Sequence, residues 1–180
     1  MTAPAHPSAA QEAQARLIRE AMRYLGTKET IGANGIGTNR GIRVDYWNFE
    51  AGADPNTSPP WCAGFFGQMG IQAVGREAWG FLHSDSVQEI VTEATKRQCF
   101  TTDFSDACRR VIAGVVWWYD TLTPARYGHI GIVTRVDPAA RVFDSIEGNT
   151  NTGDSRDGYE VALHKNRPVS ARVGFLLWPA

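Results

Sequence analysis

Three short segments of the chain carry residues that could together cleave an amide bond. Cys62 lies where the proline-rich loop of residues 52–60 runs into an apolar stretch. His129 begins a later apolar run, and Glu147 and Asn149 follow it. A thiol at a helix entrance becomes a thiolate readily, because a helix N-terminus favours negative charge. With a histidine as base and a carboxylate or amide to orient that histidine, such a thiolate is a catalytic nucleophile. If the segments meet, we expect a cysteine hydrolase.

His129 is the best placed of the four histidines to serve as the base. His6 lies in the N-terminal arm, His83 in a loop and His164 in a polar segment. His129 instead follows Gly128 at the start of a hydrophobic strand, and a rigid strand end is a good place from which to aim an imidazole.

The strand order predicts that Glu147 returns to the side of His129. Residues 130–136 and 141–146 form two apolar runs around a turn at 137–140. Counting outward from that turn in an antiparallel hairpin pairs Val136 with Arg141 and therefore Ile130 with Glu147. Glu147 is thus the expected third member of the site, and Asn149 stays open as the alternative.

Size and composition indicate one globular domain. The chain has 180 residues, of which 43% are hydrophobic, and we expect a flexible arm at 1–8 and one catalytic domain at 9–180. Its net charge of −1 gives no indication of nucleic-acid binding. No apolar run approaches the roughly 20 residues that span a membrane, and the first residues lack the pattern of a secretory signal. We therefore expect synthesis in the cytoplasm without a signal peptide and no membrane insertion.

The cysteines give no indication of a metal site. There are three, an odd number, and there is no C-x-x-C motif. Cys99 and Cys108 could pair in an oxidising compartment or remain as buried thiols. No histidine lies near them at ligand spacing, so we expect no metal and no cofactor.

Helical patterns come first along the chain and strand patterns afterwards, which predicts an α+β domain with a central antiparallel sheet. A capping pattern at Ser86 opens the last of the long helices. Gly64, Gly67 and Gly70 would let another backbone, such as a sheet, approach their helix. Residues 30–41 form a glycine-rich loop without the Lys-Ser/Thr ending of a phosphate loop. The expected helices are 9–25, 43–51, 62–74 and 86–98, and the expected strands are 111–119, 128–136, 141–146, 158–163 and 170–178.

The motifs around these residues resemble those of the CHAP family, the cysteine, histidine-dependent amidohydrolases/peptidases. The resemblance covers residues 14 to 178 and rests on four segments: Trp61-Cys62-Ala63-x-Phe65, Gly128-His129-Ile130-Gly131-Ile132-Val133, Ile146-Glu147-Gly148-Asn149-Thr150 and Asn39-Arg40-Gly41-x-x-Val44-Asp45. It implies a papain-like fold and hydrolysis of peptidoglycan, at the muramoyl–L-alanine amide or within the stem peptide or cross-bridge. It also implies that Cys62 is the nucleophile, His129 the base and Glu147 the orienting group, with Asn149 supporting them or replacing Glu147.

The resemblance leaves the biological setting open between a phage endolysin, a secreted antibacterial effector, which would have an immunity protein as partner, and a housekeeping enzyme that remodels the wall. We expect a monomer. Some family members bind calcium before the cysteine, but Asp45, Glu50 and Asp54 do not form a dense acidic pattern. Trp61 and Trp117 are weaker candidates for cleft walls. The rival hypotheses are an inactive binding module of the same fold and a redox protein that uses Cys62 with another cysteine.

Overall fold

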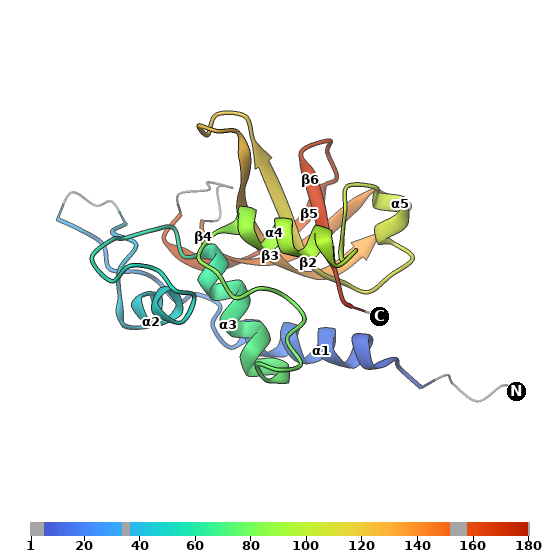
Figure 1. Ribbon diagram of the computed structural model, residues 1–180, viewed down its shortest axis with the longest axis horizontal. Helices are drawn as coiled ribbons and strands as arrows, with labels where there is room; N and C mark the ends of the chain where they lie inside the picture. Colours follow the sequence, from blue (N-terminus) through green and yellow to red (C-terminus); the bar gives the residue numbers. More distant parts are fainter. Residues whose placement is uncertain (1–5, 34–36, 152–157, 180) are drawn as a thin grey trace, which may run out of the picture.

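The computed structural model shows an α+β protein in which N-terminal helices pack on a six-stranded antiparallel sheet (Figure 1). It describes residues 6–33, 37–151 and 158–179. Part of the expected arm (1–5), part of the glycine-rich loop (34–36) and the turn residue Asp157 therefore lie outside the described residues.

The first helix, α1, spans Ala9–Met22 and begins with a capping box. The Ser8 side chain accepts a hydrogen bond from the Gln11 backbone N–H, and the Gln11 side chain accepts one from the Ser8 N–H. The expected extension to residue 25 is wrong, because residues 23–25 continue as tighter turns that bond three residues back. Leu25, at the end of these turns, is 37% exposed.

The other long helices begin and end close to the predicted residues. Helix α2 spans Ile42–Glu50, α3 spans Cys62–Val74 and α4 spans Val87–Lys96. The Ser86 side chain caps α4, as predicted. A short helix, α5 (Phe104–Ala107), was not predicted, since four residues are too few to show a helical period.

The glycines of α3 do permit close approach, but not by the sheet. A Cβ on Gly64 would lie 2.8 Å from the carbonyl oxygen of Trp47 in α2. A Cβ on Gly67 would lie 2.3 Å from the ring of His83, in the loop before α4. The expectation that another backbone approaches these glycines is confirmed at Gly64, where the backbone is that of α2 and not that of a sheet. At Gly67 the close neighbour is a side chain of the loop at 80–86.

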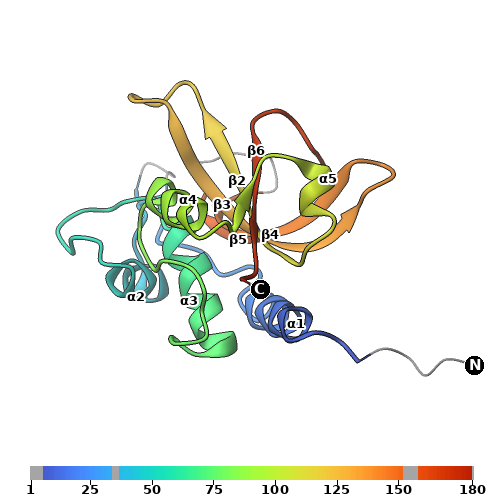
Figure 2. The same cartoon turned by 45° about the vertical axis from the view of Figure 1, so that its right-hand side comes forward.

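All neighbouring strands of the sheet run antiparallel, in the order β1-β6-β2-β3-β4-β5. Five strands correspond to predicted runs, while β1 has only two residues and was missed. The sheet is strongly twisted, so that β2 and β3 rise above β4 and β5 (Figures 1 and 2). The strands are β1 Phe100–Thr101, β2 Ile112–Tyr119, β3 Arg126–Asp137, β4 Val142–Thr150, β5 Glu160–Pro168 and β6 Val173–Leu177.

The β3–β4 hairpin differs in register from the prediction. The strands close at the pair Asp137–Val142, and an irregularity between Val133 and Arg135 adds one residue to β3. The turn therefore closes in a different register from the predicted pair Val136–Arg141, and that register alone would place Glu147 opposite Ile132. The bulge shifts the pairing by one residue, so that Glu147 lies opposite Gly131 and not opposite the predicted Ile130.

The main core lies between the helices and the sheet, where α1, α2 and α3 lie along the lower side of the molecule in Figure 1. The side chain of Gln14 on α1 accepts a 2.7 Å hydrogen bond from the Trp178 indole and donates to the Val133 carbonyl of β3. This contact ties the C-terminal segment and the sheet to the first helix. A smaller apolar cluster surrounds α5, with Phe104, Phe143 and Phe175 as its rings.

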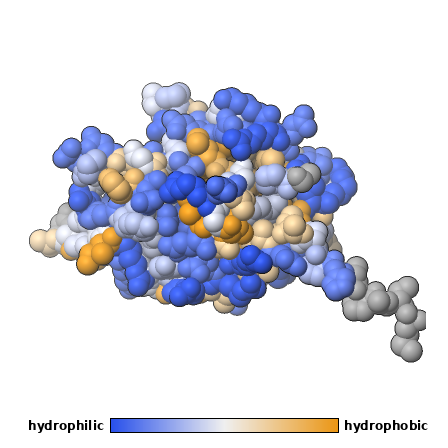
Figure 3. Space-filling view, turned by 60° about the horizontal axis from the view of Figure 1, so that its bottom comes forward, coloured by the Kyte–Doolittle hydropathy of each residue, from blue (hydrophilic) through white to orange (hydrophobic). Residues whose placement is uncertain are grey.

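On the surface that Figure 3 shows, hydrophobic residues lie in separate patches between hydrophilic ones. Within the described ranges, no helix has both the length and the apolar character to cross a membrane.

Candidate active site

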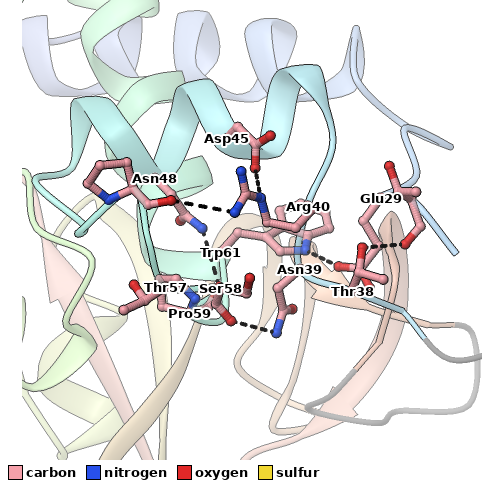
Figure 4. A network of polar contacts seen from close by, with 12 residues as sticks. Glu29, Thr38, Asn39, Arg40, Asp45, Asn48, Thr57, Ser58, Pro59 and Trp61 are labelled. Carbon is pink, nitrogen blue, oxygen red and sulfur yellow. Dashed lines mark hydrogen bonds and ion pairs between the residues drawn. The ribbon is translucent and has the colours of Figure 1, made fainter. Parts of the chain in front are cut away.

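Cys62 is the first residue of α3, and the loop before it is held by side-chain hydrogen bonds (Figure 4). The Asn39 amide donates to the Ser58 carbonyl at 3.1 Å, and the Asn48 amide donates to the Pro59 carbonyl at 3.2 Å. These bonds satisfy two carbonyls of a loop that cannot bond through its prolines. They fix the direction in which the chain enters α3, and with it the position of Cys62.

A third contact holds the residue directly before Cys62. The Trp61 indole Nε1 donates to Glu29 Oε2 at 2.6 Å, and both side chains are buried. Trp61 has no exposed surface and packs against Trp47 and Phe65. Its burial argues against the predicted contact with substrate and makes it a core residue that supports the position of Cys62.

His129 lies near the start of β3 between two candidate partners. Its Nε2 lies 2.8 Å from Glu147 Oε2, while Nδ1 has no hydrogen-bond partner among the described residues. The ring is only 3% exposed. Burial alone would lower the pKa of His129, but interactions with the Cys62 side chain and with the Glu147 carboxylate outweigh burial and raise this pKa to about 10. The imidazolium is therefore the stable form of His129 at neutral pH.

Glu147 is held as an anion by its neighbours. The Ser145 hydroxyl donates to Oε1 at 2.5 Å, and Arg167 Nη1 lies 3.4 Å from the same oxygen. Burial by itself would raise the pKa of Glu147, but the hydrogen bond from His129 and the charges of His129 and Arg167 lower it. Neither Ser145 nor Arg167 belongs to a recognisable motif, so sequence reasoning missed both.

The one-residue change in register is what allows Glu147 to reach His129. Cross-strand partners share a face of the sheet, so pairing with Ile130 would have pointed Glu147 away from His129. Pairing with Gly131 instead puts Glu147 on the face of His129, two residues away. A Cβ on Gly131 would lie 2.6 Å from Glu147 Cγ, so the glycine leaves the space that the glutamate crosses.

Asn149 is also buried in β4, at 1% exposure, with a left-handed φ of 55°. Between Glu147 and Asn149, a Cβ on Gly148 would lie 2.7 Å from the Trp61 ring, so this glycine lets β4 approach the start of α3. The structure places Glu147 on the His129 ring nitrogen, and a supporting role for Asn149 stays a prediction.

Trp117 is half-buried beside His129. The ring centroids of the two residues are 5.3 Å apart, and the Arg167 guanidinium lies 4.7 Å from the Trp117 ring. Trp117 therefore packs against both the His129 imidazole and the Arg167 guanidinium. Its neighbour Trp118 is half-buried as well.

Cys62 opens onto a cleft of about 240 Å³. One wall is the segment just before and at the start of α4, and the other is formed by Leu122 and the start of β3. The wall at α4 was not predicted, because no motif marks it and only the fold brings it to Cys62. The cleft is lined by Pro60, Cys62, Asp85, Ser86, Val87, Leu122, Arg126, Tyr127 and Gly128.

No group of three His, Cys, Asp or Glu side chains within the described part of the chain could hold a metal ion. Cys99 and Cys108 are free thiols, the first buried in the main core and the second half-buried against the smaller cluster.

Comparisons with protein-family models, with curated proteins and with solved structures found no match.

Proposed function

We propose that this protein is a cysteine hydrolase that cleaves an amide bond of peptidoglycan. The observation that carries the proposal is the buried His129, which contacts Glu147 through Nε2, has no partner on Nδ1 among the described residues, and interacts with Cys62 strongly enough to change its pKa. A nucleophile, a base and a group that orients the base are the parts that acyl transfer requires. Cys62 also lines an open cleft, which gives a substrate a route to the thiol.

The reaction begins with attack of the Cys62 thiolate on the amide carbon. The carbonyl oxygen becomes an oxyanion, and the protonated His129 gives its proton to the leaving amine as the carbon–nitrogen bond breaks. His129 then takes a proton from water, whose hydroxide attacks the thioester and releases the acid and the thiol. Glu147 keeps the imidazole in one orientation throughout and stabilises its positive charge.

The start of α3 can supply the donors for the oxyanion. Side chains cap α1, α4 and α5, but no side chain caps α3. Its first backbone N–H groups, including that of Cys62, are therefore available beside the reacting thiol. Backbone donors that are fixed before the reaction stabilise an oxyanion without reorganisation, and the positive end of the helix dipole adds to the effect.

The choice of peptidoglycan rests on the motifs around Cys62, His129 and Glu147, which resemble those of CHAP hydrolases. A helix that carries cysteine, followed by an antiparallel sheet that carries histidine, is also the papain-like arrangement. The proposal covers either biological setting, an endolysin released from a phage-infected cell or an effector delivered to a competitor.

The test is digestion of purified cell wall by the wild type and by Cys62→Ala and His129→Ala. We expect both variants to lose lysis, because each removes a member of the acyl-transfer machinery. Cys108→Ala is the matched control: it removes a half-buried thiol beside the smaller apolar cluster and should leave lysis unchanged. Full lysis by Cys62→Ala would exclude the proposal. Mass spectrometry of the wild-type products then identifies the bond: a free lactyl group on muramic acid indicates an amidase, and a cut peptide indicates an endopeptidase.

A further inference from the structure

The walls of the cleft beside Cys62 carry two opposite charges that no other described residue neutralises. Asp85 lies on the wall at α4, and Arg126 lies on the wall at β3. Among the described residues, Asp85 makes no ion pair or hydrogen bond through its side chain. Arg126 Nη1 donates only to neutral carbonyl oxygens, those of Thr123 at 3.4 Å and Pro124 at 3.2 Å.

These two charges are held in a fixed relation to each other. Gln88, in the first turn of α4, accepts a 3.1 Å hydrogen bond from the backbone N–H of Tyr127. Gln88 follows Asp85 by three residues, and Tyr127 directly follows Arg126. The bond therefore ties the two walls together next to the charged side chains.

We propose that Asp85 and Arg126 form the specificity site of the hydrolase, for a peptide with a free ammonium and a free carboxylate near the scissile amide. This inference rests on the proposed function. Asp85 accepts hydrogen bonds from the ammonium, and Arg126 donates to the carboxylate, whose planar geometry suits a guanidinium. Because the cleft of about 240 Å³ also contains Cys62, a peptide held there presents its amide to the thiol.

A substrate with only one of the two charges fits this cleft less well. A peptide with an ammonium alone would cover Arg126 without giving it a counter-charge, and the desolvated guanidinium would lower its affinity. The chemical class that satisfies both walls is an amino-acid head, with ammonium and carboxylate on one carbon. Within a wall peptide, the side-chain end of a diamino dicarboxylic acid has this structure.

The test measures binding without catalysis. Two synthetic stem peptides, one with diaminopimelic acid at the third position and one with lysine, differ there by a single carboxylate. Each is titrated calorimetrically into the Cys62→Ala protein, which cannot cleave them. We expect the diaminopimelic peptide to bind at least about tenfold more tightly, the size of one charge-assisted contact.

Variants of the two walls then assign the preference to its residues. In the Cys62→Ala background, Arg126→Gln should remove the difference between the peptides, and Asp85→Asn should weaken both. Arg109→Gln and Asp106→Asn are matched controls, because they break an exposed ion pair at α5 and leave the cleft intact. Thermal unfolding verifies that each variant is folded before its affinity is compared.

Equal affinity for the two peptides, or a preference that persists in Arg126→Gln, would overturn the inference. The proposed hydrolysis is tested independently of this preference. A preference without wall digestion by the wild type would leave the charge site in place and remove the enzymatic proposal. Wall digestion by the wild type without a preference between the two peptides would leave the enzymatic proposal in place and remove the charge site.

Discussion

Two buried glutamates hold the two halves of the candidate site, and each does so by accepting a hydrogen bond from a ring nitrogen. Glu29 accepts from the Trp61 indole at 2.6 Å, and Glu147 contacts the His129 imidazole at 2.8 Å. The exposed fractions of the glutamates are 5% and 1%. The Glu29–Trp61 contact and the Glu147–His129 contact are therefore nearly the same in length and in burial.

Their chemistry differs because only one ring titrates. An indole N–H donates a hydrogen bond at every working pH, so Glu29 can fix a position and nothing else. An imidazole gains and loses a proton, so Glu147 also changes how strongly that proton is held. Arg167 lies beside Glu147 and keeps it anionic. The comparison separates a structural contact, which positions the residue before Cys62, from an electrostatic one, which affects the protonation of His129.

The same substitution at both positions should separate these roles. Glu147→Gln removes the charge that stabilises the imidazolium, and we expect wall hydrolysis to fall by about 10²–10⁴-fold, the range seen when an orienting carboxylate is neutralised. Glu29→Gln keeps an acceptor for Trp61. We expect it to reduce hydrolysis by less than about tenfold and to lower the free energy of unfolding by about 1–3 kcal/mol, because a buried charged hydrogen bond is weakened.

Both variants are measured by steady-state wall digestion and by urea unfolding. A Glu29→Gln protein that is stable but inactive would mean that the Trp61 contact has a chemical role. A Glu147→Gln protein with wild-type hydrolysis would remove Glu147 from the mechanism and leave Asn149 as the third member of the site.

The titration of His129 is the next largest expected effect. Its pKa is raised to about 10, so the proton that the leaving amine needs is lost as the pH rises through that value. We expect hydrolysis to stay high through neutral pH and to fall about tenfold per pH unit above about 10. The pair also affects stability. Its contribution is fully present below the ordinary histidine pKa of about 6.5, declines as the pH rises, and is lost above about 10.

NMR titration of the His129 ring measures this directly. Cys62→Ala and Glu147→Gln should each lower the pKa of His129, because each removes a negative charge that raises it. If the pKa of His129 in the wild type lies near the ordinary histidine value, then Cys62 and Glu147 do not stabilise the imidazolium.

The nucleophile half of the site was predicted well from sequence because its information is local. The proline-rich loop and the apolar run that follows mark the helix start, and α3 begins at Cys62 as expected. The strand that carries His129 was likewise predicted from its own local run of apolar residues. Glu29 is different: it lies 32 residues before Trp61, in a segment without a pattern, and only the fold brings the two together.

The base half depends on details that local patterns do not contain. The turn closes at Asp137–Val142, the bulge between Val133 and Arg135 then shifts the register by one residue, and Gly131 leaves the space that Glu147 crosses. A count outward from the turn gave the correct neighbourhood for Glu147 but the wrong partner. Arg167 comes from β5, a further strand away, where its polar neighbours gave no reason to select it.

Arg167 should have the smallest effect of the site residues. Its Nη1 lies 3.4 Å from Glu147 Oε1 and contributes to the lowered pKa of Glu147, after the hydrogen bond and charge of His129. Arg167→Gln should therefore raise the pKa of Glu147, and the acid limb of the pH–activity profile should move to higher pH. Since the contacts from His129 and Ser145 remain, hydrolysis at neutral pH should fall by less than about tenfold.

Arg167→Lys should return the acid limb to its wild-type pH because it keeps the charge. Arg135→Gln, which breaks a more exposed ion pair with Asp144, should not shift the acid limb. An acid limb that is unchanged in Arg167→Gln would mean that His129 alone keeps Glu147 anionic, and the difference between the two buried glutamates would then come entirely from the ring that each one contacts.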